Sequence, residues 1–306
     1  SYTFVNGILT VTQIPVIITA EDKSRPYLAD NPILTYVITD IEGTVIEIPG
    51  TPALSTTAAP GSVVGEYPIT IAQGTLDSNY SYTFVEGTLI ITQVPLIAAV
   101  ENKSRPYRAE NPVLTYVITD TEGAVVEIPG TPELITSAVP ESPVGTYPIL
   151  IAQGTLDNNY SYTFVEGSLT ITQAPATVIA ENKSRPYHGD NPELTYTITD
   201  AAGSLIEIPG IPELSTTAAL ESSVGEYPIA IAQGSLDAVN YSYTFVNGTL
   251  TVTQAPATVT AENKNRPYHG DNPELTYTIT DAMGTVIEIP GIPELSTTAA
   301  LESSVG

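Results

Sequence analysis

The feature that most constrains the fold of this chain is an internal repeat of about 80 residues. Lys-Ser-Arg-Pro-Tyr begins at Lys23, Lys103 and Lys183, and Lys-Asn-Arg-Pro-Tyr begins at Lys264, so the spacings are 80, 80 and 81 residues. A unit that returns at a fixed spacing indicates one folded module multiplied in tandem. We predict a terminal hairpin of a preceding module at 1–13, three complete modules at 14–93, 94–173 and 174–254, and an incomplete module at 255–306, as in an excerpt of a longer array.

Period-two alternation predicts short β-strands throughout each module. In the third module Leu194, Tyr196 and Ile198 share one face while threonines occupy the other, which is the pattern of a half-buried strand. No segment has helical periodicity over three turns. The strands predicted in this module cover 177–180, 194–199, 205–208, 214–217, 227–231, 241–245 and 250–252.

Two further signals concern how these strands are connected. Asn247-Gly248 lies between two alternating segments and predicts a β-hairpin. The same slot holds Asn6-Gly7, Glu86-Gly87 and Glu166-Gly167. Pro228 predicts an edge strand or a strand start, because proline has no backbone N–H to donate to a neighbouring strand.

About six or seven short strands in one module favour a small Ig-like β-sandwich, and hence an all-β chain. A β-grasp-like module is the alternative, provided that one segment is helical. Between modules runs Thr-Gln-(Val/Ala)-Pro, with no Gly/Ser spacer, at 92–95, 172–175 and 253–256. A proline-bearing junction of this kind limits bending, so the array is expected to be an elongated, semi-rigid rod.

Composition excludes several classes of function. The net charge of −25 disfavours nucleic acid and anionic lipid as partners, and no apolar run is long enough to insert into a membrane. The chain has no Cys, so it has no disulfides and no thiolate chemistry. Its two imidazoles, His188 and His269, occupy one repeated position that holds Leu28 and Arg108 in the other modules. We therefore expect no enzyme activity.

One loop carries a resemblance to a known family. The pattern is Lys-x-x-x-Tyr-x-Gly-Asp-x-Pro-x-Leu-Thr-Tyr, formed by Lys183, Tyr187, Gly189, Asp190, Pro192, Leu194, Thr195 and Tyr196. Together with the later Val-Gly-x-Tyr-x-Ile, it resembles the MBG domain of the YGX type over the whole sequence. The first two modules depart from it at Leu28-Ala29-Asp30 and Arg108-Ala109-Glu110, which bears on the local turn and not on the fold. The resemblance implies stalk units of large secreted or surface-anchored bacterial proteins, many of them adhesins.

Acidic side chains are the candidates for metal binding. Calcium prefers six to eight convergent oxygen ligands, but the chain contains no Asp-x-Asp-x-Asp-Gly loop. The alternative is a solvated acidic surface that keeps a long rod soluble, with no cofactor. The candidate Ca²⁺ ligands are Glu21, Asp22, Asp30, Asp40, Glu42 and Asp77, with equivalents in each module.

Basic residues and asparagines supply two further sets of candidates. A Lys and an Arg two positions apart follow the first strand of every module, and we expect them to pair with carboxylates of the same or the preceding module and to help fix the junction. These candidates are Lys23, Arg25, Lys103, Arg105, Lys183, Arg185, Lys264 and Arg266. Asn-x-Ser/Thr triplets, where a glycan could be attached, occur at Asn79, Asn102, Asn159, Asn182, Asn240 and Asn247.

The function favoured by these observations is structural: a stalk region of a giant extracellular protein that projects a binding region from the cell. Its partners would be the neighbouring modules of the same chain. One alternative is a self-assembling extracellular filament or sheath, in which like chains are partners. Another is a carbohydrate-binding module repeated for avidity, which would need exposed aromatic platforms such as Tyr27, Tyr107, Tyr187 and Tyr268.

Overall fold

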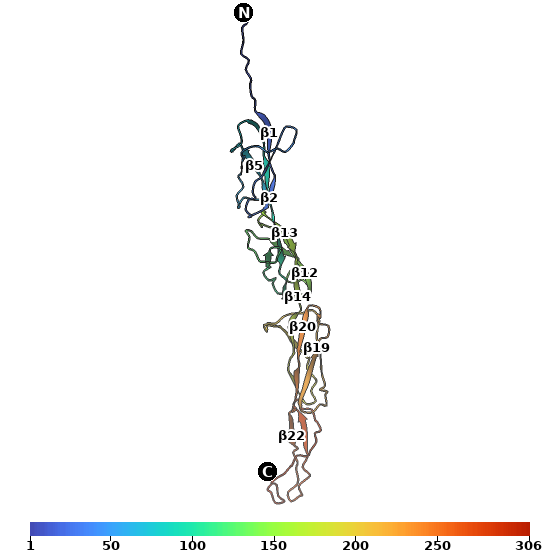
Figure 1. Cartoon of the computed structure of the whole chain (residues 1–306). Helices are drawn as coiled ribbons and strands as arrows, with labels where there is room; N and C mark the ends of the chain where they lie inside the picture. Colours follow the sequence, from blue (N-terminus) through green and yellow to red (C-terminus); the bar gives the residue numbers. More distant parts are fainter. The chain divides into compact units, whose positions relative to one another are not determined.

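The computed structural model describes residues 1–306, and all of its regular elements are β-strands (Figure 1). The all-β prediction is therefore confirmed, and the helical segment required by the β-grasp alternative is not found. The chain divides into two compact units, Ser1–Thr172 with the first two repeats and Gln173–Gly306 with the rest. It contains no helix of the length and apolarity needed to cross a membrane.

Each complete repeat contains seven strands in the same order. The first has β1 (Ile14–Ala20), β2 (Lys23–Pro26), β3 (Tyr36–Thr39), β4 (Ala53–Thr56), β5 (Gly65–Ala72), β6 (Tyr80–Val85) and β7 (Gly87–Thr92). The second has β8 (Val94–Val100), β9 (Lys103–Pro106), β10 (Tyr116–Thr119), β11 (Glu133–Thr136), β12 (Gly145–Ala152), β13 (Tyr160–Val165) and β14 (Gly167–Thr172). The third has β15 (Ala174–Ala180), β16 (Lys183–Pro186), β17 (Tyr196–Asp200), β18 (Glu213–Thr216), β19 (Gly225–Ala232), β20 (Tyr241–Val246) and β21 (Gly248–Thr253). Residues 255–306 contain only β22 (Ala257–Ala261) and β23 (Tyr277–Asp281), which pair with each other.

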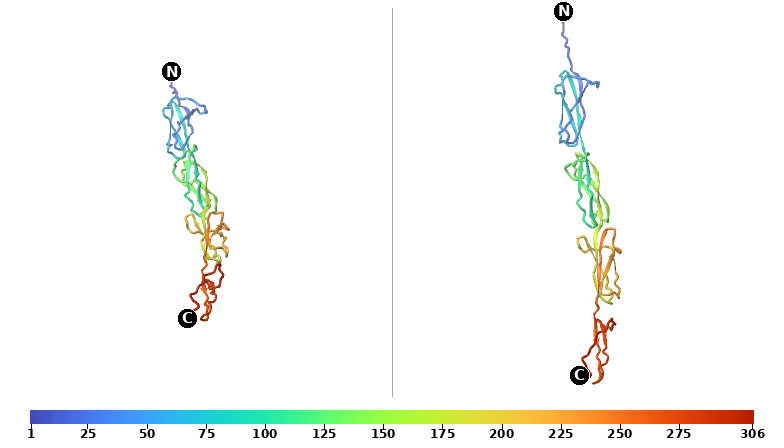
Figure 2. Two further views of the ribbon diagram at one scale, coloured as in Figure 1. Left: turned by 90° about the horizontal axis from the view of Figure 1, so that it is seen from below. Right: turned by 60° about the horizontal axis from the view of Figure 1, so that its bottom comes forward.

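The strands of each repeat form two sheets, and each repeat is its own bundle of strands (Figure 2). In the first repeat the three-stranded sheet has the order β3-β1-β6 and the four-stranded sheet has the order β2-β7-β5-β4. Two of the pairings are parallel, β1 with β6 and β2 with β7, and the others are antiparallel. The second and third repeats have the same arrangement.

The buried residues of the first two repeats form two clusters in each repeat, and Ile71 and Ile151 each contact both clusters of their repeat. Alternation buries one face of β1, where Val16 and Ile18 are at most 1% exposed. Ala20 at the end of β1 packs with Leu89 and Ile91 of the other sheet, which are equally buried. Burial of each such aliphatic side chain contributes roughly 1.5–3 kcal/mol, so this alternating pattern is the main source of stability for so short a set of strands.

The hairpin predicted at Asn247-Gly248 is wrong. The strands on either side, β20 and β21, do not pair: β20 pairs with β15, whereas β21 pairs with β16 and β19 in the other sheet. A two-residue Asn-Gly hairpin needs left-handed backbone at both central positions, and Gly248 is not left-handed. Glycine is required there for space, because a Cβ atom would lie 2.7 Å from the carbonyl oxygen of Ala180.

Three other local predictions differ from the structure. Residues 1–13 form no strand. They correspond to β6 and β7, which in a complete repeat pair with β1, β2 and β5, and the structure contains no such partner strands for them. Residues 205–208 also form no strand, since only Leu205 makes an isolated bridge, to Thr199, before Pro209 and Gly210 turn the chain. Pro228 lies in β19, which has a neighbouring strand on each side and is therefore not an edge strand. The pairing of β19 with β18 includes Ile229 but not Pro228, so the missing N–H of Pro228 removes no hydrogen bond from that pairing.

The departure of the first two repeats from the Gly of the resemblance motif does not change the turn. In every copy the residue before that position has a left-handed backbone, with φ of 67° at Leu28, 64° at Arg108, 58° at His188 and 61° at His269. The next residue donates its N–H to a proline carbonyl in the same turn. Ala29 donates to Pro26, and Gly189 donates to Pro186. Because this next residue does not itself need a positive φ, alanine and glycine are both accommodated there.

Candidate functional site: the contact between the first two repeats

The linker between the first two repeats is a single residue that is bound to the second repeat. β7 ends at Thr92 and β8 begins at Val94. The Nε2 atom of Gln93 donates to the carbonyl oxygens of Asn158, at 2.9 Å, and Tyr160, at 3.2 Å. The backbone N–H of Val94 donates to the carbonyl of Asn159 at 3.3 Å. The connection is therefore one residue long, and three hydrogen bonds at Gln93 and Val94 attach it to the second repeat.

Two contacts beside the linker also join these repeats. The N–H of Val64 donates to Oδ1 of Asn159 at 2.9 Å, and Nδ2 of Asn159 donates to Oδ1 of Asp157 at 2.8 Å. The Tyr27 and Tyr160 rings meet edge to face, with centroids 5.6 Å apart and planes at 88°. An aromatic pair of this geometry contributes about 0.5–1.5 kcal/mol beyond its buried area. With the linker, these contacts give three points of attachment.

The two tyrosines next to this contact, Tyr160 and Tyr162, have raised pKa values because they are partly buried. Burial, followed by the neighbouring Tyr27 and Asp157, raises the pKa of Tyr160. Burial also raises the pKa of Tyr162 to about 12, and its hydroxyl donates to the carbonyl oxygen of Asp157 at 2.8 Å. Tyr162 thus fixes the loop that presents Asn159 and Tyr160 to the first repeat.

Raising the pH from 10 to 12 should therefore lower the free energy of unfolding. The pKa of Tyr162 and Tyr243 is about 12 in the folded chain, against 10.0 for an exposed tyrosine. This stabilisation is fully present below pH 10 and is lost as the pH rises towards 12, because the unfolded chain ionises first. Urea unfolding across this interval, with tyrosinate absorbance as a second signal, measures it. The double variant Tyr162→Phe/Tyr243→Phe should show a flatter profile, and an equally steep profile would contradict the assignment.

A buried arginine supports the loop that carries Val64. Arg25 is only 4% exposed, and its guanidinium donates to Oδ1 of Asn31 at 2.7 Å and to the carbonyls of Pro26 at 3.2 Å and Ala59 at 2.6 Å. Asn31 in turn donates to the carbonyl of Ala58 at 2.6 Å. Arg105 and Arg185 make the same set of contacts, and Arg266 makes them in an exposed setting.

The arginines thus do not form the salt bridges expected from the sequence, because their partners are neutral oxygens and not carboxylates. The reason is local: the guanidinium is enclosed by its own loop, whose backbone carbonyls point inward and supply acceptors. The lysines do pair with carboxylates, but only with the Glu two residues earlier: Lys23–Glu21 at 3.1 Å, Lys103–Glu101 at 3.0 Å, Lys183–Glu181 at 3.3 Å and Lys264–Glu262 at 3.1 Å. Such surface pairs contribute at most about 1 kcal/mol.

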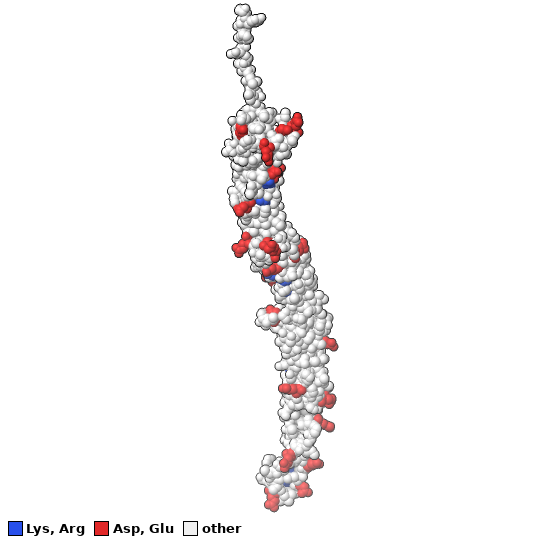
Figure 3. Space-filling model, in the orientation of Figure 1, with Lys and Arg blue, Asp and Glu red and all other residues white.

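Four of the six acidic candidates, Glu21, Asp22, Asp40 and Asp77, accept hydrogen bonds from other groups of the first repeat. Glu21 accepts from the Thr35 hydroxyl and from Lys23, and these bonds lower the pKa of its carboxyl. Asp22 accepts from the N–H of Thr88, Asp40 from those of Glu42 and Thr44, and Asp77 from that of Asn79, while Asp30 and Glu42 are exposed. Figure 3 shows the acidic side chains as separate patches. No three His, Cys, Asp or Glu side chains come together in a group that could hold a metal ion.

The candidate glycosylation sites fall into two structural groups. Asn159 and Asn240 are partly buried, and the amide nitrogen of each donates to an Asp three or fewer residues earlier. Asn79, Asn102, Asn182 and Asn247 are exposed. Three of these exposed residues use Oδ1 as an acceptor, Asn102 from Ser168, Asn182 from Thr249 and Asn247 from Ile231.

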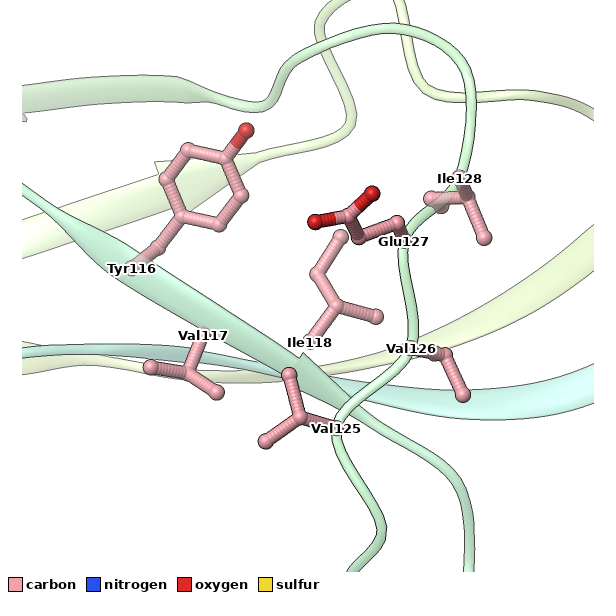
Figure 4. A pocket seen from close by; sticks show the side chains of 7 residues that line it. All are labelled: Tyr116, Val117, Ile118, Val125, Val126, Glu127 and Ile128. Atoms are coloured by element: carbon pink, nitrogen blue, oxygen red, sulfur yellow. The ribbon is translucent and has the colours of Figure 1, made fainter.

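A shallow hollow opens beside the edge strand of the second repeat. It has a volume of about 400 Å³ and is lined by Tyr116–Ile118 of β10 and by Val125–Ile128 (Figure 4). Tyr116 and the Glu127 carboxylate face one another across it (Figure 4). The third repeat has an equivalent hollow of about 370 Å³, lined by residues 196–198 and 205–208. No histidine, serine or lysine lines either hollow.

The role of Asn159, Tyr160 and Tyr27 at the contact was not predicted from the sequence. The sequence indicates Asn159 only as a glycosylation candidate and Tyr27 only as an exposed aromatic platform. The signal that could have identified them is their place next to turns in every copy, where the sequence repeats them as Tyr107, Asn240 and Tyr241.

Comparison with known proteins identifies the repeats. Residues 16–90, 96–170 and 176–251 match the family model of the MBG domain (YGX type), and each match lies within one of the complete repeats. No curated protein was found to match the chain. The three matched segments cover more than two thirds of the sequence. The chain therefore belongs to the MBG domain (YGX type) family and carries three tandem copies of it.

Proposed function

We propose that these tandem repeats are a stalk region of a giant extracellular bacterial protein, an adhesin, which projects a binding region from the cell. The observation that carries the proposal is the contact between the first two repeats. A one-residue linker whose side chain is bound to the next repeat, with two contacts beside it, resists bending where a flexible linker would not. Neighbouring modules of the same chain are thus the partners.

The proposal includes three finer statements about the repeats. We infer that each is an Ig-like sandwich, a view supported by two sheets and by two buried clusters that Ile71 of β5 contacts together. We infer that the region acts without catalysis or a cofactor, a view supported by the two imidazoles, His188 and His269, whose position holds Leu28 and Arg108 in the other repeats. An acidic surface with a net charge of −25 suits a long chain that must stay soluble outside the cell.

Small-angle scattering of the 306-residue chain tests the stalk. The expected particle is a rod on the order of 130–150 Å long, from four module lengths of short strands, against a diameter near 45 Å for one globule. A compact, near-spherical particle would refute the proposal. Electron microscopy of the same sample separates the rival class, because ordered multi-chain fibres would support a filament and isolated thin particles a stalk.

A matched pair of variants tests whether the contact stiffens the junction. Asn159→Ala removes the bond to Val64 and should shorten the mean dimension of the particle in solution and broaden its distribution. Asn79→Ala changes the equivalent, exposed residue of the first repeat and should leave both unchanged. An identical scattering curve for both variants and the parent would contradict the stiffening role of this bond.

A further inference from the structure

The first two strands of each repeat pair with its last two strands, in parallel and with a constant register, and together they form one ribbon. In the first repeat Ile14–Thr19 pair with Tyr80–Val85, and Lys23–Pro26 pair with Leu89–Thr92. The difference between partner numbers is 66 in both segments, although the first lies in one sheet and the second in the other. It is again 66 throughout the second repeat and 67 throughout the third. The two chain segments therefore change sheets together, without a slip.

A side-chain hydrogen bond bridges the point where the ribbon changes sheets. Between the two paired segments of the first repeat, Oδ1 of Asp22 accepts from the N–H of Thr88 at 2.7 Å. Asn102 and Asn182 do the same for Ser168 and Thr249, each at 2.8 Å. The adjacent Gly87 allows the backbones to approach closely, since a Cβ atom there would lie 2.7 Å from the Ala20 carbonyl oxygen. The side chain thus replaces a ladder bond at the bend.

The direction in which the ribbon runs determines how tension loads it. The chain enters the repeat at the first residue of β1 and leaves it at the last residue of β7. Since the paired strands are parallel, these two points lie at opposite ends of the ribbon. Tension along the chain then slides one strand along the other and loads the inter-strand hydrogen bonds together. Tension applied at one end of the ribbon would instead open them one after another.

We propose that this ribbon is the load-bearing clamp of each repeat, which makes a repeat resist unfolding when it is pulled along the chain. The buried residues that alternate along it, including Ile18 and Leu89 at 0% exposure, must leave the core before the strands can slide. The biological role of the clamp rests on the proposed stalk function, because a stalk under shear from flow or from a bound surface carries tension through every repeat.

Single-molecule force spectroscopy on the full chain tests the clamp. The chain has no cysteine, so pairs of introduced cysteines define the points of attachment. Gln13→Cys/Gln93→Cys pulls the first repeat from opposite ends of the ribbon. Gln13→Cys/Ser78→Cys pulls at one end only, because the Gln13 side chain donates to the Ser78 carbonyl at 2.7 Å. All three substituted residues are exposed.

The expected result is an unfolding force several-fold higher for the first pair than for the second at the same pulling speed. The first pair should lengthen by on the order of 230 Å in one step, from the extended length of the 80-residue segment less its folded span. Equal forces in both geometries would overturn the clamp. Equal forces with a rod-shaped particle in scattering would refute the clamp and leave the stalk proposal intact. Unequal forces with a compact particle would refute the stalk proposal and leave the clamp intact.

The bridge at the bend supplies a second test in the same repeat. Asp22→Ala should lower the force for the Gln13→Cys/Gln93→Cys pair and leave that for the Gln13→Cys/Ser78→Cys pair nearly unchanged. Asp22→Asn is the matched control, because asparagine is the residue at this position in the second and third repeats and its Oδ1 makes the same bond there. If Asp22→Ala lowers both forces equally, or if Asp22→Asn lowers the first force as much, the bridge is not part of the clamp.

Discussion

Replacing Arg25, Arg105 and Arg185 together by alanine should lower the free energy of unfolding by about 3–5 kcal/mol per repeat. Each guanidinium is 4% exposed and supplies hydrogen bonds to two backbone carbonyls and one asparagine side chain. Without it, these acceptors stay inside the loop without a donor, and that cost is added to the lost bonds. A repeat of about 80 residues has only about 4–12 kcal/mol of stability in all, so the urea midpoint should fall sharply.

The neighbouring lysines provide the matched control for this prediction. Lys23, Lys103 and Lys183 lie two residues before the arginines in the same strands, but their ion pairs are at the surface. Changing all three to alanine should cost at most about 1 kcal/mol per repeat. Arginine-to-lysine variants separate charge from geometry, since lysine keeps the charge but cannot reach three acceptors in a fork, and they should be nearly as unstable as the alanine variants. Equal losses for the lysine and arginine sets would show that burial is not what matters.

The contrast between these residues illustrates what a charge pattern reveals. Lys23 and Arg25 look alike in the sequence, as two repeated cations in an acidic chain. Alternation along β2 places Lys23 and Arg25 on the same face, where Lys23 is half-buried at the end of the strand and Arg25 is buried. Only the loops at 31 and 58–59 supply the acceptors that enclose Arg25. Those loops lie up to 34 residues away in the sequence. The sequence pattern therefore identified the residues but not their partners.

The same distinction holds for the fold. Alternation predicts which residues of a strand are buried, and it located strands such as β17 and β20 to within two residues. It carries no information on which strand is the neighbour, because any strand with an apolar face satisfies it. The parallel pairing of β15 with β20 joins segments that lie about 67 residues apart, and no turn signal marks such a pair. Asn247-Gly248 is misleading for this reason. Its local sequence indicates a hairpin, but β20 before it and β21 after it pair in different sheets.

The second large effect concerns a glycine at which two loops of a repeat touch. Gly130 has φ of 88°, and a Cβ atom on it would lie 2.0 Å from the carbonyl oxygen of Thr155. Thr131 and Thr155 hold these loops together, with the Thr155 N–H donating to the Thr131 carbonyl at 2.9 Å and the Thr131 N–H to the Thr155 hydroxyl at 3.0 Å. The clash is with backbone, so no side-chain rotation relieves it. The loops must separate, and both bonds are lost with them.

Changing this glycine to alanine in all three repeats should therefore cost about 3–5 kcal/mol per repeat. A matched control exists seven residues earlier, where Gly123 has nearly the same φ, 91°, but no atom within 4 Å of its Cβ position. Alanine there adds only the strain of a left-handed backbone, about 1–2 kcal/mol. The test set is Gly50, Gly130 and Gly210, and the control set is Gly43, Gly123 and Gly203. Because the two sets share their backbone conformation, the difference between their urea midpoints isolates the contact between the loops, and equal midpoints would mean that the loops separate freely and contribute nothing to the stability of the repeat.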